Sequence, residues 1–124
     1  MVASNEFPND PVSARAAREF VADILEPLGL ETEVARIVTS ELATNVVRHA
    51  RTPFRVTVAV QPDTIRIEVE DGAGAQEIGT AMASERAGRG LLIVERAATS
   101  WGVQHRGEKK VVWVVLPTQR EVDA

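Results

Sequence analysis

Residues 31–50 have the period of one long amphipathic helix, but the face that should be apolar changes character halfway along. At about 100° per residue, the first half of this face carries Val34, Ile37 and Val38. The same i, i+3 and i+4 steps then lead to Glu41, Asn45 and Arg48. A carboxylate, an amide and a guanidinium directed at the core require either an internal hydrogen-bonded network or a pocket for a polar ligand. The helix by itself leaves both alternatives open.

The hydrophobic period changes to two after this helix. Apolar and polar residues alternate over residues 54–60 and again over residues 65–70, with a polar connection at 61–63. This pattern predicts an antiparallel hairpin with one wet face. The same alternation places Asp71 on the inward face of the second strand, whereas Glu70 points to solvent. A second inward carboxylate is therefore expected at a strand end.

The remaining segments complete an α+β pattern. An Ala-rich helix is predicted over residues 12–28, capped by Asp10, ended by Pro27 and Gly29, with an apolar stripe of Ala16, Phe20, Val21, Ile24 and Leu28. Residues 75–87 are predicted to be a mobile loop, 91–98 a short helix, 101–105 and 111–116 strands, and 1–11 at most a short edge strand. The expected fold is a two-layer α/β sandwich with a mixed, mostly antiparallel sheet and about three helices on one face.

Composition limits both the domain organisation and the function. With 124 residues and 44% hydrophobic content, residues 1–124 are expected to form a single domain, loosely ordered at 1–11 and 118–124. The lack of cysteine excludes disulfides and thiolate zinc sites, and two histidines cannot form a histidine-rich metal cluster. A formal charge of −4 without a basic tract argues against direct nucleic-acid binding. Because the chain has neither a membrane-length apolar run nor an export signal, a cytoplasmic location without membrane contact is expected.

Gly88 and Gly90 precede the short third helix. Glycines that open a helix leave backbone N–H groups accessible to an anion such as phosphate, although glycine at this position is more often only a turn. The polar line of the long helix, Asp71 and this opening converge on one helix–sheet interface. That convergence favours a ligand pocket over an internal network.

These residues resemble the GHKL (Bergerat-fold) ATP-binding family, and within it the small anti-sigma-factor serine/threonine kinase-like proteins of actinomycetes. The resemblance extends over about residues 12–116. The run Ser-Glu-Leu-Ala-Thr-Asn-Val-Val-Arg-His-Ala at 40–50 is similar to the N box, and Gly-Arg-Gly-Leu at 88–91 is similar to the G2 region. The resemblance implies that the chain binds ATP and Mg²⁺.

Three residues receive specific roles from the resemblance. Asn45 is implied to coordinate the Mg²⁺ that bridges the ATP phosphates, which suits an amide oxygen as a hard ligand. Glu41 matches the glutamate that acts as general base toward a substrate hydroxyl; its alternative is a carboxylate that binds metal-bound water or caps a network. Asp71 matches the aspartate that accepts a hydrogen bond from the adenine amino group.

Further positions follow from the same motifs. Arg48 matches a basic residue near phosphate, with a salt bridge at the pocket rim as the alternative, and His49 matches an N-box histidine for which packing or capping is favoured over catalysis. The remaining cofactor-binding positions implied are Gly72, Gly74, Gly88, Arg89, Gly90 and Leu91. Three leucines are assigned to the core first: Leu42, Leu91 and Leu92.

Two departures from the family pattern affect the adenine end. The G1 box is usually Asp-x-Gly-x-Gly, whereas residues 71–74 read Asp-Gly-Ala-Gly, one residue short or with alanine in place of glycine. Val111 stands where many relatives have a threonine that helps to hold the aspartate and a water.

Two functions are therefore compared. The first is a protein serine/threonine kinase that phosphorylates a STAS-type anti-anti-sigma partner, sequesters a sigma factor, or does both, in a family that often forms homodimers. The second is a non-catalytic GHKL-fold interaction regulator with weak or no ATP binding. The presence of Glu41 and Asn45 favours the kinase, while the altered G1 box and Val111 favour the regulator.

Overall fold

The computed structural model describes residues 1–72 and 89–121. Along the described chain the elements are β1 (Val2–Phe7), α1 (Val12–Leu25), the 3-10 turn η1 (Glu26–Leu28), α2 (Glu33–His49), β2 (Phe54–Val60), β3 (Thr64–Asp71), α4 (Arg89–Ala97), β4 (Ser100–Arg106) and β5 (Lys109–Pro117). The predicted loop at 75–87 lies outside the described residues. No helix in the described part of the chain is long and apolar enough to cross a membrane.

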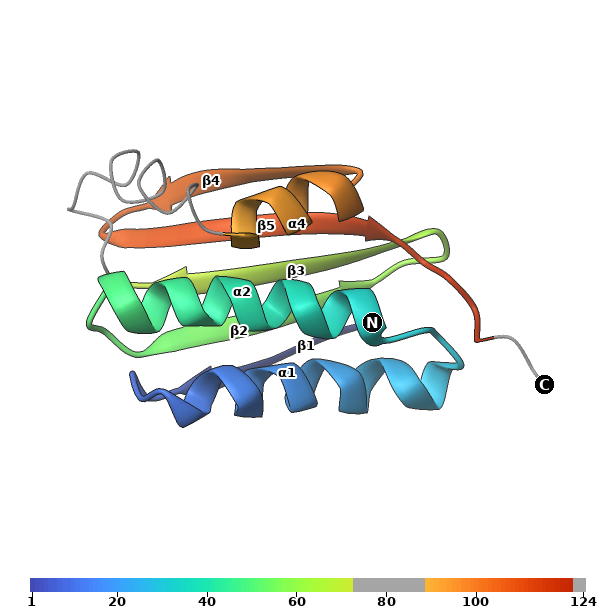
Figure 1. Ribbon diagram of the computed structural model, residues 1–124, viewed down its shortest axis with the longest axis horizontal. Helices are drawn as coiled ribbons and strands as arrows, with labels where there is room; N and C mark the ends of the chain where they lie inside the picture. Colours follow the sequence, from blue (N-terminus) through green and yellow to red (C-terminus); the bar gives the residue numbers. More distant parts are fainter. Residues whose placement is uncertain (73–88, 122–124) are drawn as a thin grey trace.

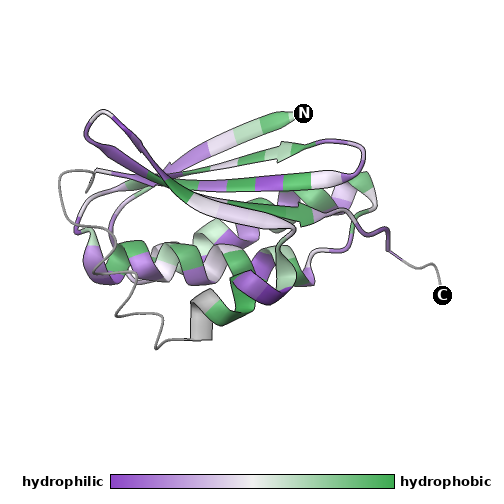
Figure 2. Cartoon of the chain, turned by 90° about the horizontal axis from the view of Figure 1, so that it is seen from above, coloured by the Kyte–Doolittle hydropathy of each residue, from purple (hydrophilic) through white to green (hydrophobic). Residues whose placement is uncertain are grey.

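The five strands form one sheet in the order β1-β2-β3-β5-β4. All four neighbouring pairs are antiparallel, so the described sheet is antiparallel throughout, and the predicted mixed sheet is wrong in this detail. Strand β5 lies between β3 and β4, a position with a partner on both sides that agrees with its nearly continuous apolar run. The helices α1, α2 and α4 cover one face of the sheet (Figures 1 and 2). The two-layer α+β sandwich is thus confirmed.

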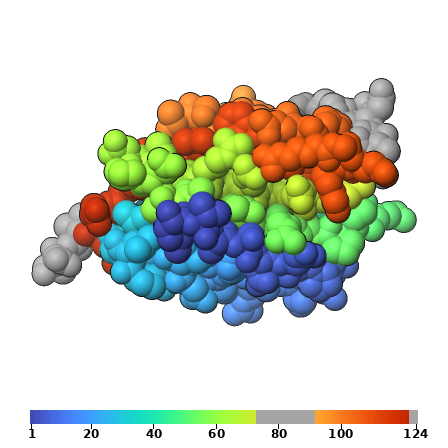
Figure 3. Space-filling model, turned by 180° about the vertical axis from the view of Figure 1, so that it is seen from behind, coloured from blue at the N-terminus to red at the C-terminus, as the bar shows by residue number. Residues whose placement is uncertain are grey.

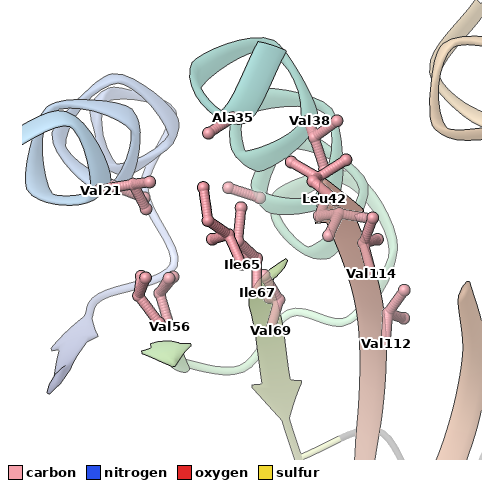
Figure 4. Close-up of a cluster of buried hydrophobic side chains, with 14 of the residues drawn as sticks. Val21, Ala35, Val38, Leu42, Val56, Ile65, Ile67, Val69, Val112 and Val114 are labelled. Atoms are coloured by element: carbon pink, nitrogen blue, oxygen red, sulfur yellow. The ribbon is translucent and has the colours of Figure 1, made fainter. Parts of the chain in front are cut away.

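The core lies between the helices and the inward face of the central strands (Figure 4). Strands β2 and β3 alternate as predicted, because Val56, Val58, Ile67 and Val69 are almost completely buried and their neighbours in sequence are not. The helices contribute small and branched side chains to the same cluster: Val21, Ala35, Val38 and Leu42. Burial of this apolar surface is the main term that stabilises the fold.

Helix α1 is rotated by about one residue from the predicted stripe. Its buried residues are Ser13, Ala17, Val21, Ala22 and Leu25, while Ala16 is exposed and Phe20 and Ile24 are only partly buried. The α-helix ends at Leu25, so Leu28 lies in η1 and is exposed. Gly29, with φ of 73°, then ends the turn, as predicted. Leu42 is buried as expected, but Leu92 on α4 is 48% exposed, which contradicts its assignment to the core.

Both ends of the described chain are attached, the first to the sheet and the last to the connection between η1 and α2. Strand β1 pairs with β2 over six residue pairs, which agrees with an edge strand and differs from a loosely ordered end. The segment after β5 is also fixed, because the Glu31 N–H donates to the Gln119 carbonyl at 2.7 Å and the Glu121 N–H donates to the Gly29 carbonyl at 3.0 Å. The expectation that the C-terminal end frays is therefore wrong through Glu121.

The outward face of the sheet lies opposite the helices and is viewed in Figure 3. Trp113 of β5 lies on this face beside Gly102 of β4, its partner in the β4–β5 register. The guanidinium carbon of Arg66 lies 4.7 Å from the centre of the Trp113 ring, and Arg66 Nε donates to Glu68 at 2.7 Å. A Cβ on Gly102 would lie 2.8 Å from the Trp113 ring, so this close contact requires glycine.

Candidate functional site

The polar line of α2, formed by Glu41, Asn45 and Arg48, lies on the side of the helix and does not face the sheet. The buried side of α2 consists of Ala35, Val38, Thr39, Leu42, Ala43 and Val46. Val34 and Ile37, which belong to the line that continues to Glu41, are 38% and 40% exposed. Glu41 and Asn45 are partly buried, and Arg48 is exposed. The predicted core-facing stripe is therefore wrong in direction except at Val38, which is completely buried. The polar residues border the core at a surface that a ligand can reach.

This flank faces away from α1. Arg36 of α2 forms a bidentate ion pair with Glu19 of α1, with nitrogen–oxygen distances of 2.8 and 2.9 Å. Asn45 follows Arg36 by nine residues, about two and a half helical turns, and so lies on the opposite side of α2. Helices α1 and α4 lie on either side of α2 (Figure 1). Asn45, with Glu41 one turn before it, therefore lies on the α4 side.

Asp71 occupies the inward face at the end of β3, as the strand alternation predicts. Only 1% of its surface is exposed, and it shares this face with Ile67 and Val69. In the β3–β5 register Asp71 pairs with Lys110, whose Nζ lies 3.9 Å from Asp71 Oδ2. Lys110 is itself only 7% exposed. The site thus contains a buried carboxylate and a buried ammonium side by side.

The β5 residue opposite Asp71 is Lys110 and not Val111. The register pairs Val111 with Glu70, whereas Asp71 pairs with Lys110. Because neighbouring strand residues point to opposite faces, Val111, which is completely buried, does not share the face of Asp71. The loss of a polar contact at Val111 stays a prediction, and the register directs attention to Lys110 instead. The sequence signal for Lys110 was its parity with Val112, Val114 and Leu116, which form the inward face of β5.

Hydrogen bonds hold the C-terminal end of α2 next to the end of β3. The Gly72 N–H donates to Thr52 Oγ1 at 2.9 Å. Asn9 Nδ2 donates to the Val46 carbonyl at 3.3 Å and to the Thr52 carbonyl at 2.8 Å. A Cβ on Gly72 would lie 3.3 Å from Thr52 Cγ2, so the close approach favours glycine. Asn9 and Thr52 thus connect the α2 polar line with the Asp71 end, and neither was identified from the sequence.

The other expected site residues lie around this end to different degrees. His49 is the last residue of α2 and is partly buried. Helix α4 begins at Arg89, two residues earlier than predicted, so Arg89 and Gly90 belong to its first turn and Leu91 follows them. Gly74 and Gly88 lie outside the described residues. The structure therefore brings the α2 line, Asp71 and Gly72 to one end of the described fold.

A separate hollow lies at the other end of α2. It has a volume of about 220 Å³ and is lined by residues that include Val34, Ala35, Ile65, Arg96 and Leu116. Ala35 precedes Asn45 by ten residues, about 15 Å along the helix axis. This hollow is therefore distinct from the cluster of expected site residues.

The polar residues suit a metal that is shared with a ligand better than a metal held by protein alone. Within residues 1–72 and 89–121, no group of three or more His, Cys, Asp or Glu side chains could hold a metal ion. Mg²⁺ often takes only one or two protein oxygens and completes its coordination with phosphate and water. The partly buried amide of Asn45 fits that arrangement.

Comparison with known proteins identifies the family. The family described as histidine kinase-like ATPase domain matches residues 7–116. The chain belongs to this family. This result confirms the GHKL resemblance on which the residue roles were based.

A solved structure agrees with the fold of this histidine kinase-like ATPase domain. The crystal structure of the RsbU and RsbW domains of Rv1364c from Mycobacterium tuberculosis is similar, with a TM-score of 0.74 and 15% sequence identity. The similarity covers 97% of this chain and 32% of that chain, so this chain spans about a third of the matched protein's length. A comparison with curated protein sequences found no match.

Proposed function

We propose that this chain is an ATP- and Mg²⁺-dependent protein serine/threonine kinase of the anti-sigma-factor type. It phosphorylates a STAS-type anti-anti-sigma partner and sequesters a sigma factor. The histidine kinase-like ATPase family supports nucleotide binding, and the similarity to a structure that contains an RsbW domain supports the fold. The observation that carries the proposal is the partly buried pair Glu41 and Asn45, one helical turn apart on the α4 side of α2.

Asp71 provides the base-binding end of the proposed site. Its carboxylate is buried and held at the end of β3, so it can accept a hydrogen bond from the amino group of adenine without competition from bulk water. The hydrogen bond from the Gly72 N–H to Thr52 Oγ1 holds the backbone directly after Asp71. This end selects the nucleotide.

Asn45 and the start of α4 provide the phosphate-binding end. The amide oxygen of Asn45 would hold Mg²⁺, which when bound neutralises charge on the phosphate oxygens. The first turn of α4, which includes Gly90, presents backbone N–H groups that favour an anion. Arg48, exposed at the end of α2, adds a positive charge at the rim.

Glu41 performs the proton transfer. Its carboxylate accepts the proton of a serine or threonine hydroxyl as the hydroxyl oxygen forms a bond to the γ-phosphorus. The bond between that phosphorus and the β–γ bridging oxygen breaks, and ADP leaves with the electron pair. Because Glu41 is only partly buried, the hydroxyl of a protein substrate can reach it from the flank of α2.

The test is a comparison of Glu41→Ala with Glu33→Ala. Glu33 is an exposed carboxylate in the first turn of the same helix, so its removal controls for the loss of one negative charge on α2. We expect Glu41→Ala to lower phosphate transfer to a STAS-domain substrate by about 10²–10⁴-fold and to leave ATP affinity nearly unchanged. Equal loss of transfer and ATP binding would assign Glu41 to structure or metal binding instead.

One observation favours the alternative function, a non-catalytic interaction regulator of the same fold. Residues 71–74 read Asp-Gly-Ala-Gly where the family usually has Asp-x-Gly-x-Gly, so the nucleotide-binding motif that starts at Asp71 departs from the family pattern. Calorimetric titration of the chain with ATP and Mg²⁺ separates the two functions. Heat that saturates supports the kinase, and a flat titration across a wide concentration range supports the regulator.

A further inference from the structure

Lys110 is a buried cation in a position that an apolar residue could fill. Its neighbours on the inward face of β5 are Val112 and Val114, both part of the hydrophobic core. Replacing a buried ion pair by well-packed apolar residues is often neutral or stabilising, because taking two charges out of water is costly. The stability of the fold therefore does not require a lysine at position 110, whereas a role in ligand binding would explain it.

The pair presents a hydrogen-bond acceptor and a hydrogen-bond donor side by side. Asp71 Oδ2 and Lys110 Nζ are 3.9 Å apart, which is longer than the 2.7–3.2 Å typical of a direct hydrogen bond between them. An ammonium has three N–H donors, and a carboxylate can accept about four hydrogen bonds, so the contact between these two groups does not by itself use the full capacity of either. A ligand edge with an adjacent donor and acceptor can therefore bind to both.

Adenine has an edge of this kind. Its 6-amino group is a donor, and the neighbouring ring nitrogen N1 is an acceptor. Guanine has the reverse order at the same two positions, because its O6 is an acceptor and its N1 carries a proton. With the acceptor on β3 and the donor on β5, the pair distinguishes the two bases by position.

We propose that Lys110 is a specificity-determining residue whose ammonium donates a hydrogen bond to N1 of adenine while Asp71 accepts one from the 6-amino group. The proposal rests on the proposed function, since it requires that the site binds ATP. It adds a second direct contact to the base edge, supplied by a residue that the family motifs did not indicate. It also gives the buried ammonium a partner on the ligand.

The first test uses the unmodified chain with two nucleotides. ATP and 1-deaza-ATP differ in that the second has a C–H group in place of N1, so it cannot accept the hydrogen bond. A hydrogen bond to a charged group of this kind corresponds to roughly a 10- to 100-fold difference in affinity. We expect calorimetry to show that the chain binds 1-deaza-ATP more weakly than ATP by this factor.

The second test uses Lys110→Met, which keeps most of the apolar stem and removes the ammonium. The affinity ratio between ATP and 1-deaza-ATP should fall to about 1 in this variant. Lys109→Met is the matched control, because Lys109 is exposed and adjacent in sequence and its side chain points to the other face of β5. This variant should keep the ratio of the unmodified chain.

The outcomes separate this proposal from the proposed function. An unmodified chain that binds no ATP overturns both. An unmodified chain that binds ATP and 1-deaza-ATP equally well overturns only the role of Lys110, as does a Lys110→Met variant that keeps the original ratio. The first comparison needs no variant, so it decides the matter even where Lys110→Met fails to fold.

Discussion

The buried pair Asp71–Lys110 allows a quantitative prediction about stability. The Asp71 side chain is fully buried, and the Lys110 side chain is 9% exposed, so solvent screens their interaction only weakly. Two unit charges at the observed 3.9 Å attract each other by about 4 kcal/mol at an effective dielectric constant of about 20. Removal of one group of such a buried ion pair takes this attraction from the other buried charge, which costs about 3–5 kcal/mol. The two single variants, Asp71→Asn and Lys110→Met, should therefore each be strongly destabilised.

The double variant should be no less stable than either single variant. Once both charges are absent, neither desolvation penalty remains, so the double variant costs no more than one single variant and the double-mutant cycle should give a coupling energy of at least about 3–5 kcal/mol. Urea unfolding followed by far-UV circular dichroism measures all four free energies of unfolding, without nucleotide so that ligand binding does not contribute. Lys109→Met combined with Asp71→Asn is the control cycle, because Lys109 is exposed.

Additive effects would refute this reasoning. If the Asp71 and Lys110 variants add within about 0.5 kcal/mol, the two charges do not interact appreciably in the folded chain. The 3.9 Å contact would then be incidental, and the case for a paired base-reading edge would lose its structural basis. Coupling in the control cycle would indicate a general effect of net charge instead.

Two further predictions concern contacts that support the site. Asn9→Ala removes hydrogen bonds to the carbonyls of Val46 and Thr52 and should destabilise the chain by about 1–2 kcal/mol in urea unfolding. The control Asn5→Ala changes an exposed residue and should be nearly neutral, and equal stability of both variants would contradict a role for Asn9 in holding the two segments together. Gly102→Ala places a Cβ 2.8 Å from the Trp113 ring, so it should lower the free energy of unfolding by about 1–3 kcal/mol and change the tryptophan fluorescence. Unchanged stability together with an unchanged spectrum would contradict the requirement for glycine at this position.

The strand alternation predicted the burial of Asp71 correctly because a two-residue period has a single inward face. Once Ile67 and Val69 are assigned to the core, Asp71 must follow them, and the structure confirms its burial. In β5 the alternation is concealed, because residues 111–116 form a continuous apolar run. Which β5 residue faces Asp71 depends on the register with β3, and a single strand does not contain that information.

The direction of the α2 polar line could not be obtained from helical period alone. Two overlapping stripes begin in the first half of α2, one through Val34 and Ile37 and one through Ala35 and Val38. Packing against the sheet and α1 buries the second stripe, which continues through Leu42 and Val46. The choice depends on which neighbours the helix meets, including the ion pair between Arg36 and Glu19. The sequence therefore indicated the polar residues of α2, but the direction in which they point depends on the tertiary structure.

The order of strand β1 and of the segment after β5 could not be predicted from the sequence for a related reason. In β1 only Phe7 is buried, so the hydrophobic pattern is weak, and the strand forms through main-chain pairing with β2. The C-terminal segment is likewise held by backbone hydrogen bonds to residues around Gly29. Pairing partners of this kind are distant in sequence, and local patterns carry no information about them.

The outward face of the sheet helps to determine the chemistry on the inward face. A slip of one residue between β3 and β5 would move Lys110 away from Asp71 and turn the whole apolar set of β5 outward. On the outward face, Trp113 fits against Gly102 and lies under Arg66, so the same slip would also break these contacts. Register is thus specified from both sides of the sheet. The position of the buried ammonium next to the carboxylate follows from this register, and mutations of Trp113 or Gly102 should therefore alter nucleotide selection even though neither residue lies on the face of Asp71.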